Sequence, residues 1–444
     1  MLLRLKSELQ SIIKEFPNLK MQIYIGNWQT DFLRFYKSQT NYNISNNRAY
    51  ASVGLYEDKK NYSFSVCNPT AELIKEKIEQ ALPILQKLPP DPDFVDLEKD
   101  TRKAAEKSKE CNITKLPLNK KVEILKQFRD AVQPYDFDIY GTFICNFETC
   151  YILNSNGLDK KVESSPFYLE VKAVSNKNEV TVLECFGGEN LDKLNVSAMV
   201  NNLTTKVKNA QNEVVDVEAG DYEVILAPRC IGDLMSYYSW TSLAAASIDQ
   251  QDTDLVDKVD QPVFPKNFTL FDAPKHPDVV NKNYSGDGFL VEDLPIFENG
   301  VFKNFLVGNY YANKLQMKEN GNCGDCLVLK SGETSLEDMI KSVKKGLYIS
   351  SFHYMNFINS RESSLTGLTR DGTFLIEDGK ITKVVNNLRF TEKITDVVNN
   401  ITAIENKAYT IPASDNYGAF NISAQSMPHV KVKEFNISSS TKTV

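Results

Sequence analysis

Histidine is scarce in this chain, and that scarcity limits the chemistry the chain can perform. Only His276, His353 and His429 occur among 444 residues. No two of them are close enough in sequence to lie one turn apart on a helix. A catalytic zinc site usually takes closely spaced histidines, with cysteine or carboxylate ligands beside them. The sequence therefore lacks a recognisable catalytic zinc motif.

Other signatures are missing as well. There is no phosphate-binding Gly-x-x-x-x-Gly-Lys-Ser/Thr, no Gly-x-Gly-x-x-Gly and no Gly-x-Ser-x-Gly, so nucleotide hydrolysis, dinucleotide redox chemistry and α/β-hydrolase chemistry have no support. No apolar run is long enough to span a bilayer. Residues 1–16 alternate leucine and isoleucine with lysine and glutamate, which predicts an amphipathic helix rather than a signal peptide. We expect a cytoplasmic protein that does not bind membranes.

Charge and cysteine content narrow the class of protein further. The net charge is −7, and no stripe rich in lysine and arginine occurs. Proteins that bind nucleic acid usually need such a stripe, so we expect no direct binding to DNA or RNA. The eight cysteines are scattered along the chain, which is typical of a reducing compartment.

The chain is long enough for two domains. Residues 1–215 predict an α/β (α+β) domain built from two helix–strands–helix units, and residues 216–444 predict a β-rich domain resembling a barrel or sandwich. The first unit has helices at 1–16 and 70–87 and strands at 21–26, 32–36, 49–55 and 62–66. The second has helices near 122–132 and 191–209 and strands at 138–145, 149–153, 168–174 and 180–185. A polar segment, 209–221, separates the two domains.

Hairpins and one capped helix characterise the second half. Thr373–Glu377 and Lys380–Val385 predict two strands joined by Asp378-Gly379, a pair that tolerates the positive φ of a tight turn. A second hairpin is built on Asn299-Gly300. Ser335 can cap a helix through about Lys345, with Gly346 at the position after its end, where glycine is favoured.

The amino-acid sequence of Gly367–Glu392 is GLTRDGTFLIEDGKITKVVNNLRFTE, and it resembles the TldD/PmbA family. The order of elements before it also resembles this family, from about Val224 onward. PmbA is also called TldE. Members are cytosolic metallopeptidase subunits, some of them labelled modulators of DNA gyrase. Before Val224 the order of elements resembles the family, but the amino-acid sequence itself does not.

The resemblance also implies where a zinc site would stand. Catalytic members carry His-Glu-x-x-x-His on a helix after a strand like Val224–Pro228, and a cysteine near the C-terminus supplies a third ligand. Here Arg229–Ser247 contains neither histidine nor glutamate, and no cysteine follows Cys326. This is similar to the PmbA/TldE branch, which lacks the zinc motif. We therefore expect no cofactor in this chain, with zinc only in a TldD-type partner.

Large side chains occupy the stretch where those ligands would stand: Met235, Tyr237, Tyr238 and Trp240. One interpretation is that the helix simply buries Met235 and Tyr238 in a core. The other is that some of these aromatic side chains line a degenerate cleft and touch a peptide or a partner, because aromatic residues supply interface area efficiently.

The remaining candidates have little support. Cys323 and Cys326 have the spacing of half a zinc site or a redox pair, but they precede a strand and lack a second pair, so a structural role is expected. His276 is expected at the surface of a loop, and His353 in the packing of a strand. Nothing in the sequence supports a catalytic role for His429.

Our leading hypothesis is a PmbA/TldE-like subunit of a TldD-type zinc metallopeptidase that acts on unfolded peptides. Its partner would be a TldD-type subunit or a second copy of the chain, and catalysis by the chain alone is not expected. The alternative is a non-enzymatic homodimer that binds peptides or another ligand. An independent hydrolase is a weaker alternative, since no nucleophile–base pair is evident.

Overall fold

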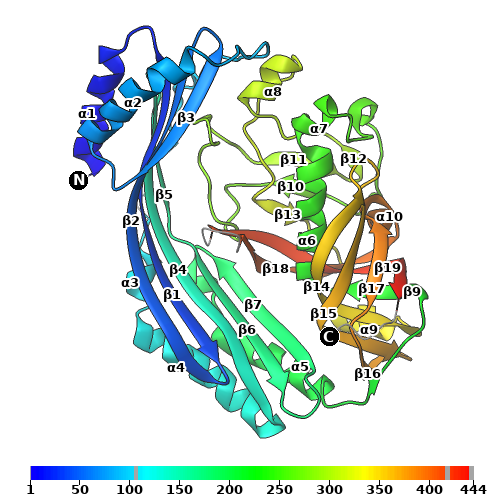
Figure 1. Cartoon of the computed structure of the whole chain (residues 1–444). Helices are drawn as coiled ribbons and strands as arrows, with labels where there is room; N and C mark the ends of the chain where they lie inside the picture. Colours follow the sequence, from blue (N-terminus) through cyan, green and yellow to red (C-terminus); the bar gives the residue numbers. More distant parts are fainter. Residues whose placement is uncertain (1, 105–108, 416–420, 440–444) are drawn as a thin grey trace.

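The computed structural model describes residues 2–104, 109–415 and 421–439, which form two sheets flanked by helices (Figure 1). The first sheet is antiparallel, in the order β3-β2-β1-β4-β6-β7, with β5 beside β4. Its strands are β1 (Lys20–Tyr36), β2 (Gln39–Glu57), β3 (Lys60–Cys67), β4 (Phe137–Asn154), β5 (Asp159–Ser164), β6 (Phe167–Ser175) and β7 (Thr181–Gly188).

Three of these strands, β1, β2 and β4, are longer than the sequence predicts. β1 and β4 each run unbroken through a stretch where the apolar pattern fails, so the prediction of two separate strands in each place was wrong. The polar residues there continue the ladder, with Asn27 opposite Thr149 and Asp31 opposite Cys145. Backbone pairing on both sides of β1 therefore outweighs the interrupted pattern.

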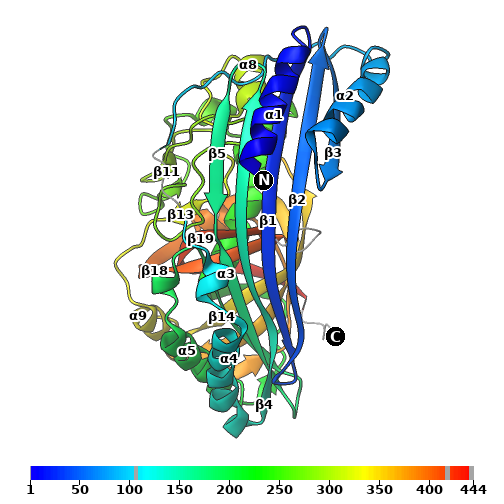
Figure 2. The same ribbon diagram turned by 90° about the vertical axis from the view of Figure 1, so that its left-hand side faces the viewer.

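The predicted helix–strands–helix units are confirmed, and they join edge to edge. β1 and β4 lie at the centre, so β3-β2-β1 on one side repeats the arrangement of β4-β6-β7 on the other. The helices α1 (Leu2–Glu15) and α2 (Ala71–Leu85) belong to the first unit, and α4 (Leu118–Val132) and α5 (Val196–Asn209) to the second. Figure 2 shows the two helix pairs beside opposite ends of the long strands.

The second sheet contains a closed barrel. β17 pairs with both β15 and β19, which closes the path β19-β9-β14-β15-β17 into a ring. Phe352, Phe390 and Phe435 pack together from three of these strands, with ring centroids 4.4–5.9 Å apart. The strands are β8 (Val214–Val215), β9 (Gly220–Leu226), β10 (Leu270–Asp272), β11 (Leu294–Glu298), β12 (Val301–Phe302), β13 (Leu327–Leu329), β14 (Lys345–Asn359), β15 (Ser364–Glu377), β16 (Lys380–Val385), β17 (Arg389–Lys393), β18 (Ile401–Asp415) and β19 (Asn421–Ser439).

The second half also carries short helices. They are α6 (Pro228–Tyr238), α7 (Ala245–Asp249), α8 (Asn309–Lys314), α9 (Leu336–Lys341) and α10 (Ile394–Asn399). Ser335 caps α9 as predicted, by accepting a hydrogen bond from the amide of Asp338. The role assigned to Gly346 was wrong, because α9 ends at Lys341 and Gly346 lies in β14. A Cβ there would meet the Glu223 carbonyl oxygen at 2.3 Å, so the glycine allows β9 to approach.

The predicted hairpin between β15 and β16 is confirmed. Asp378 and Gly379 have φ angles of 46° and 76°, and Glu377 pairs with Lys380 across the turn. The amide N–H groups of Asp378 and Gly379 also donate to the carbonyl oxygens of Lys344 and Val343. The turn is therefore fixed to the chain that connects α9 with β14.

The two sheets meet along β7, which lies against β18, β15 and β19. One buried cluster contains Met199 and Leu203 of α5 together with Phe374 and Ile376 of β15, so this part of the core draws on both halves of the chain. A domain boundary between residues 215 and 216 stays a prediction. Within the described residues, no helix is long and apolar enough to cross a membrane.

An extended segment, residues 91–104, makes a second connection between the two halves, in addition to the contact along β7. Asn309 donates to the Asp96 carbonyl oxygen, and the Asp100 carboxylate accepts from the Leu290 amide. The Glu98 carboxylate accepts from two backbone amides and also faces the Glu319 carboxyl group. Burial, together with the charge of Glu98, raises the pKa of Glu319 to about 8.

Candidate functional site

The helix α6 is the element on which the sequence places its candidate residues. It begins at Pro228, directly after β9, and proline is favoured at the first position of a helix. Gly232 lets the helix approach β18 and β19, because a Cβ there would meet Ile411 at 2.4 Å and Gln425 at 2.6 Å. The helix is therefore held closely against the barrel.

Two of the four candidate residues are part of the core. Met235 and Tyr238 are each 1% exposed. The Tyr238 ring stacks on Phe297 at a centroid distance of 6.3 Å. Its hydroxyl group has no hydrogen-bond partner among the described residues. Met235 and Tyr238 therefore pack in the core, where they cannot touch a peptide or a partner without unpacking the helix.

The other two candidates lie outside the core. Trp240 is 73% exposed, and the rings of Tyr237, Trp240 and Phe357 lie 5.1–6.4 Å apart. We call these three residues the aromatic patch. The Tyr237 hydroxyl group donates to the Met355 carbonyl oxygen at 2.8 Å, which fixes that ring. The helix continues here as a π-helical turn, Ser239–Leu243, a rare form often found at functional sites.

The side chains at this place do not fit a zinc ion. The hydroxyl oxygen of Ser236, between Met235 and Tyr237, accepts a hydrogen bond at 2.6 Å from the side-chain nitrogen Nε2 of Gln425 on β19. Zinc in proteins takes cysteine, histidine or carboxylate ligands. Among the described residues, no group of three or more such side chains is placed to hold a metal ion.

The Cys323–Cys326 loop is organised around a carboxylate. Asp272 accepts hydrogen bonds from the backbone amides of Cys323, Gly324 and Cys326 at 3.0–3.2 Å. Neither thiol forms a disulfide; Cys323 is exposed, whereas Cys326 is buried, and this burial raises the pKa of the Cys326 thiol. Because a thiol is reactive as the thiolate, this environment favours the structural role expected from the sequence.

The three histidines differ in their surroundings. His276 lies half-buried in its loop, and its ring accepts from the Asp278 amide. The expectation that His353 packs within its strand was wrong: its side chain is exposed on β14, beside Tyr354. His429, in contrast to His353, has a buried side chain on β19.

His429 belongs to a buried polar network that the sequence analysis missed. Its Nδ1 lies 2.6 Å from a Glu405 oxygen, and its Nε2 lies 3.0 Å from the Tyr348 hydroxyl group. Tyr409 donates to the other Glu405 oxygen. Burial lowers the pKa of His429, so the neutral ring donates from Nδ1 to the carboxylate and accepts from Tyr348. In the sequence, the spacing of Met427 and His429 places both side chains on one face of a strand. This spacing could have indicated that His429 is buried together with the apolar Met427.

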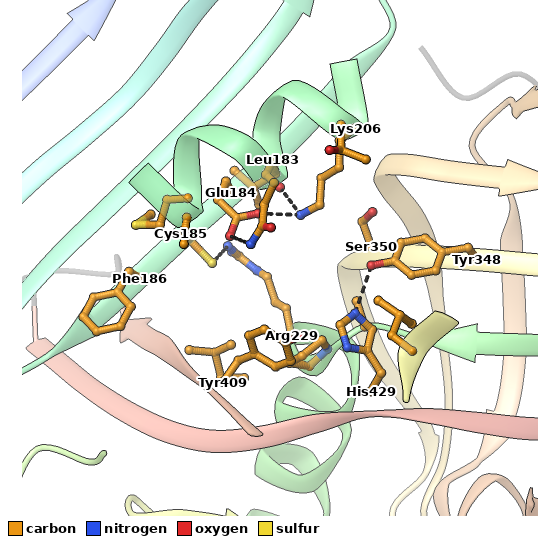
Figure 3. A pocket seen from close by; sticks show the side chains of 18 of the residues that line it. Leu183, Glu184, Cys185, Phe186, Lys206, Arg229, Tyr348, Ser350, Tyr409 and His429 are labelled. Carbon is orange, nitrogen blue, oxygen red and sulfur yellow. Dashed lines mark hydrogen bonds and ion pairs between the residues drawn. The ribbon is translucent and has the colours of Figure 1, made fainter. Parts of the chain in front are cut away.

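A cavity of about 480 Å³ lies above this network, between α5 and β7 on one side and β14, α9, β18 and β19 on the other (Figure 3). The start of α6 forms part of its wall. Polar side chains that line it include Glu184, Lys206, Arg229, Tyr348, Tyr409 and His429. A volume of this size is within the usual range for small-molecule sites, about 300–1,000 Å³.

Residues 219–439 match a family model described as the PmbA/TldA metallopeptidase C-terminal domain. Through this domain the chain belongs to the PmbA/TldD family. A zinc metalloprotease TldD homolog from Saccharolobus solfataricus is 22% identical over 62% of this chain. That alignment covers 65% of the relative, so the chain spans a little under two thirds of its length. A metalloprotease PmbA homolog from Haemophilus influenzae is 22% identical over 80% of this chain and 79% of its own.

The fold extends the likeness to the whole chain. The crystal structure of TldE from Thermococcus kodakarensis superimposes with a TM-score of 0.84, over 97% of this chain and all of that one. The two sequences are 20% identical, so this likeness establishes the fold alone. The predicted family and the predicted fold class are both confirmed.

Proposed function

We propose that this protein is a PmbA/TldE-type subunit of a TldD-type zinc metallopeptidase, and that it contributes peptide or partner contacts rather than a metal site. The observation that carries the proposal is α6. Where the resemblance places zinc ligands, α6 has a serine hydrogen-bonded to Gln425 and two core residues. Tyr237 and Trp240 of the aromatic patch stand in the same stretch of the chain. An exposed Trp beside a fixed Tyr is typical of a binding surface.

A free strand edge supports the holding of extended peptides. From Gln39 to Arg48 every side chain of β2 is exposed, and in the described chain this stretch pairs only with β1, because β3 begins its pairing at Tyr50. The backbone groups along the outer edge are thus open to another strand. Pairing there would recognise an extended peptide through its main chain, with little dependence on its sequence.

A reconstitution experiment tests the proposal. The chain and a TldD-type homologue from the same organism are purified separately and together, and cleavage of an unstructured peptide is measured with and without a chelator. We expect activity to depend on the TldD-type subunit, to increase when this chain is added, and to disappear with the chelator. Cleavage by this chain alone in the presence of the chelator would overturn the proposal.

The cavity above His429 favours a second candidate function, a non-enzymatic homodimer that binds a peptide or another ligand. Under this alternative the chain would form a dimer by itself, as measured by sedimentation, and would bind ligand without changing peptide cleavage by the TldD-type homologue. An increase in cleavage on mixing would contradict it.

A further inference from the structure

The cavity between the two sheets exposes the N-terminal end of α6. The first turn of any helix leaves amide N–H groups without partners inside the helix. Ala227, at the capping position, is 5% exposed and supplies no side-chain acceptor. The N–H groups of Arg229 and Cys230 therefore point out of an uncapped, largely buried helix end, which favours negative charge.

Arg229 brings a positive charge to the same place. One of its terminal nitrogens, Nη1, donates to Glu170 at 3.0 Å and lies 3.7 Å from the Cys185 sulfur. Nε and the other terminal nitrogen have no hydrogen-bond acceptor among the described residues. A guanidinium group has two edges that fit a carboxylate, and Glu170 uses only one nitrogen of this group. Figure 3 shows Arg229 extending across the cavity from the start of α6.

A buried hydroxyl group adds a separate observation. Ser350 lines the cavity from β14 and is 7% exposed, and its oxygen has no hydrogen-bond partner within the described chain. A buried polar group without a partner costs free energy. A ligand that fills the cavity with a polar group near β14 can supply what the protein does not.

The other walls determine what the rest of the ligand looks like. Met199, Leu183, Ile340, Phe374 and Ile381 line the cavity with apolar side chains. Two lysines reach it as well: Lys206 is paired with Glu184 at 2.8 Å, while Lys407 lies over the Tyr409 ring at 4.7 Å and has no carboxylate partner among the described residues. The site thus combines apolar walls with three cationic side chains, of which Arg229 and Lys206 already contact carboxylates and Lys407 does not.

We propose that this cavity binds a carboxylate group attached to an apolar body, with Arg229 and the start of α6 holding the carboxylate. Two sources share this chemistry, namely a free carboxylic acid and the C-terminal residue of a peptide. The proposal goes beyond the peptidase-subunit role and does not depend on it, because no partner subunit takes part in the binding.

Calorimetric titration of the full chain tests the proposal with 3-phenylpropanoate and its uncharged amide. We expect the acid to bind about tenfold more tightly than the amide, since a charge-assisted pair contributes more than a neutral one. Arg229→Gln should remove this preference. Arg102→Gln is the matched control, because it also breaks an arginine–carboxylate pair, with Asp100, but lies outside the cavity. Equal binding of acid and amide, or no saturable binding, would overturn the proposal.

A second variant covers the case in which Arg229→Gln does not fold. Ala198→Trp places a bulky group on the exposed face of α5 where that helix lines the cavity, and it should block the acid while leaving the melting curve unchanged. Undiminished binding to a folded Ala198→Trp protein contradicts the assignment of the site. Competition by a short peptide ending in phenylalanine, with a free or an amidated terminus, then identifies the source. Competition by the free terminus alone indicates a peptide end, and no competition indicates a free acid.

Discussion

Two aromatic residues at and just after the end of α6 have opposite environments, so substitutions of each one answer different questions. Tyr238 is enclosed by the core, whereas Trp240 is exposed and packs against Tyr237 and Phe357 of the aromatic patch. Replacing both at once would mix loss of packing with loss of contact. Single substitutions separate the two effects.

We predict that Trp240→Ala changes the free energy of unfolding by about 0.5 kcal/mol or less, yet lowers partner-dependent peptide cleavage roughly tenfold. Tyr238→Ala should cost about 3–5 kcal/mol through the cavity it leaves. Tyr238→Phe is the matched control, because it removes only a hydroxyl group that has no hydrogen-bond partner in the described part of the chain. Urea unfolding and the reconstituted assay measure both quantities. A stable Trp240→Ala protein with full activity would remove the aromatic patch from the functional account.

The carboxyl pair of Glu98 and Glu319 predicts a pH dependence of stability. Folding raises the pKa of Glu319 from an ordinary value near 4.5 to about 8. Between these values the folded chain keeps a proton that the unfolded chain has released. The free energy of unfolding should therefore fall as pH rises from about 4.5 to about 8.

Glu319→Gln isolates this contribution, because the amide cannot titrate. We expect the variant to gain stability relative to the natural protein as pH rises from about 5 to about 9, as measured by urea unfolding at several pH values. A difference between the two proteins that stays constant over this range would show that the pKa of Glu319 is not raised.

At the scale of elements, the β15–β16 hairpin acts through its turn as well as its strands. Gly379 needs positive φ, and a Cβ there would lie 2.8 Å from the Lys341 carbonyl oxygen. The turn thus combines a backbone requirement with a close approach to the end of α9. Gly157 has positive φ but open space around it, and Gly286 has neither feature.

We predict that Gly379→Ala costs about 1–3 kcal/mol of unfolding free energy, from strain and the close carbonyl together. Gly157→Ala should cost about 1–2 kcal/mol, since Gly157 has positive φ but open space around it. Gly286→Ala, with neither feature, should stay within about 0.5 kcal/mol. Equal effects at Gly379 and Gly286 would contradict this account of the turn.

Local signals in the sequence predicted local structure well. The Ser335 cap and the Asp378-Gly379 turn follow from the chemistry of a few adjacent residues. The polar network at His429 could not be found in this way, because Glu405, Tyr348 and His429 come together only through pairing of distant strands. The exposure of Trp240 was likewise undetermined, since it depends on where the π-helical turn leaves the core.

At the scale of the whole molecule, the two sheets share a core along β7 and α5. Each half also has a buried cluster of its own, but the shared cluster ties their unfolding together, because neither half buries all of its apolar surface without the other. The strand order alone would suggest two independent domains. Shared packing predicts one cooperative unit.

The chain contains two tryptophans, one in each half, and they report on this coupling. Trp240→Phe leaves Trp28 of β1 as the probe of the first sheet, and Trp28→Phe leaves Trp240 as the probe of the second half. We predict that fluorescence of both variants and far-ultraviolet circular dichroism give one coincident urea transition. Separate midpoints for the two probes would show that the halves unfold independently.

The outer edge of β2 also has a consequence for how the protein behaves during production. Between Gln39 and Arg48 the strand contains no proline and a single charge, at Arg48, so it lacks the usual protection against edge-to-edge aggregation. Protein made without whatever covers this edge should aggregate as its concentration rises. Ile44→Lys, which adds a charge at an exposed position of the strand, should raise the soluble yield without changing the melting temperature, and co-expression with the natural occupant of the edge should achieve the same.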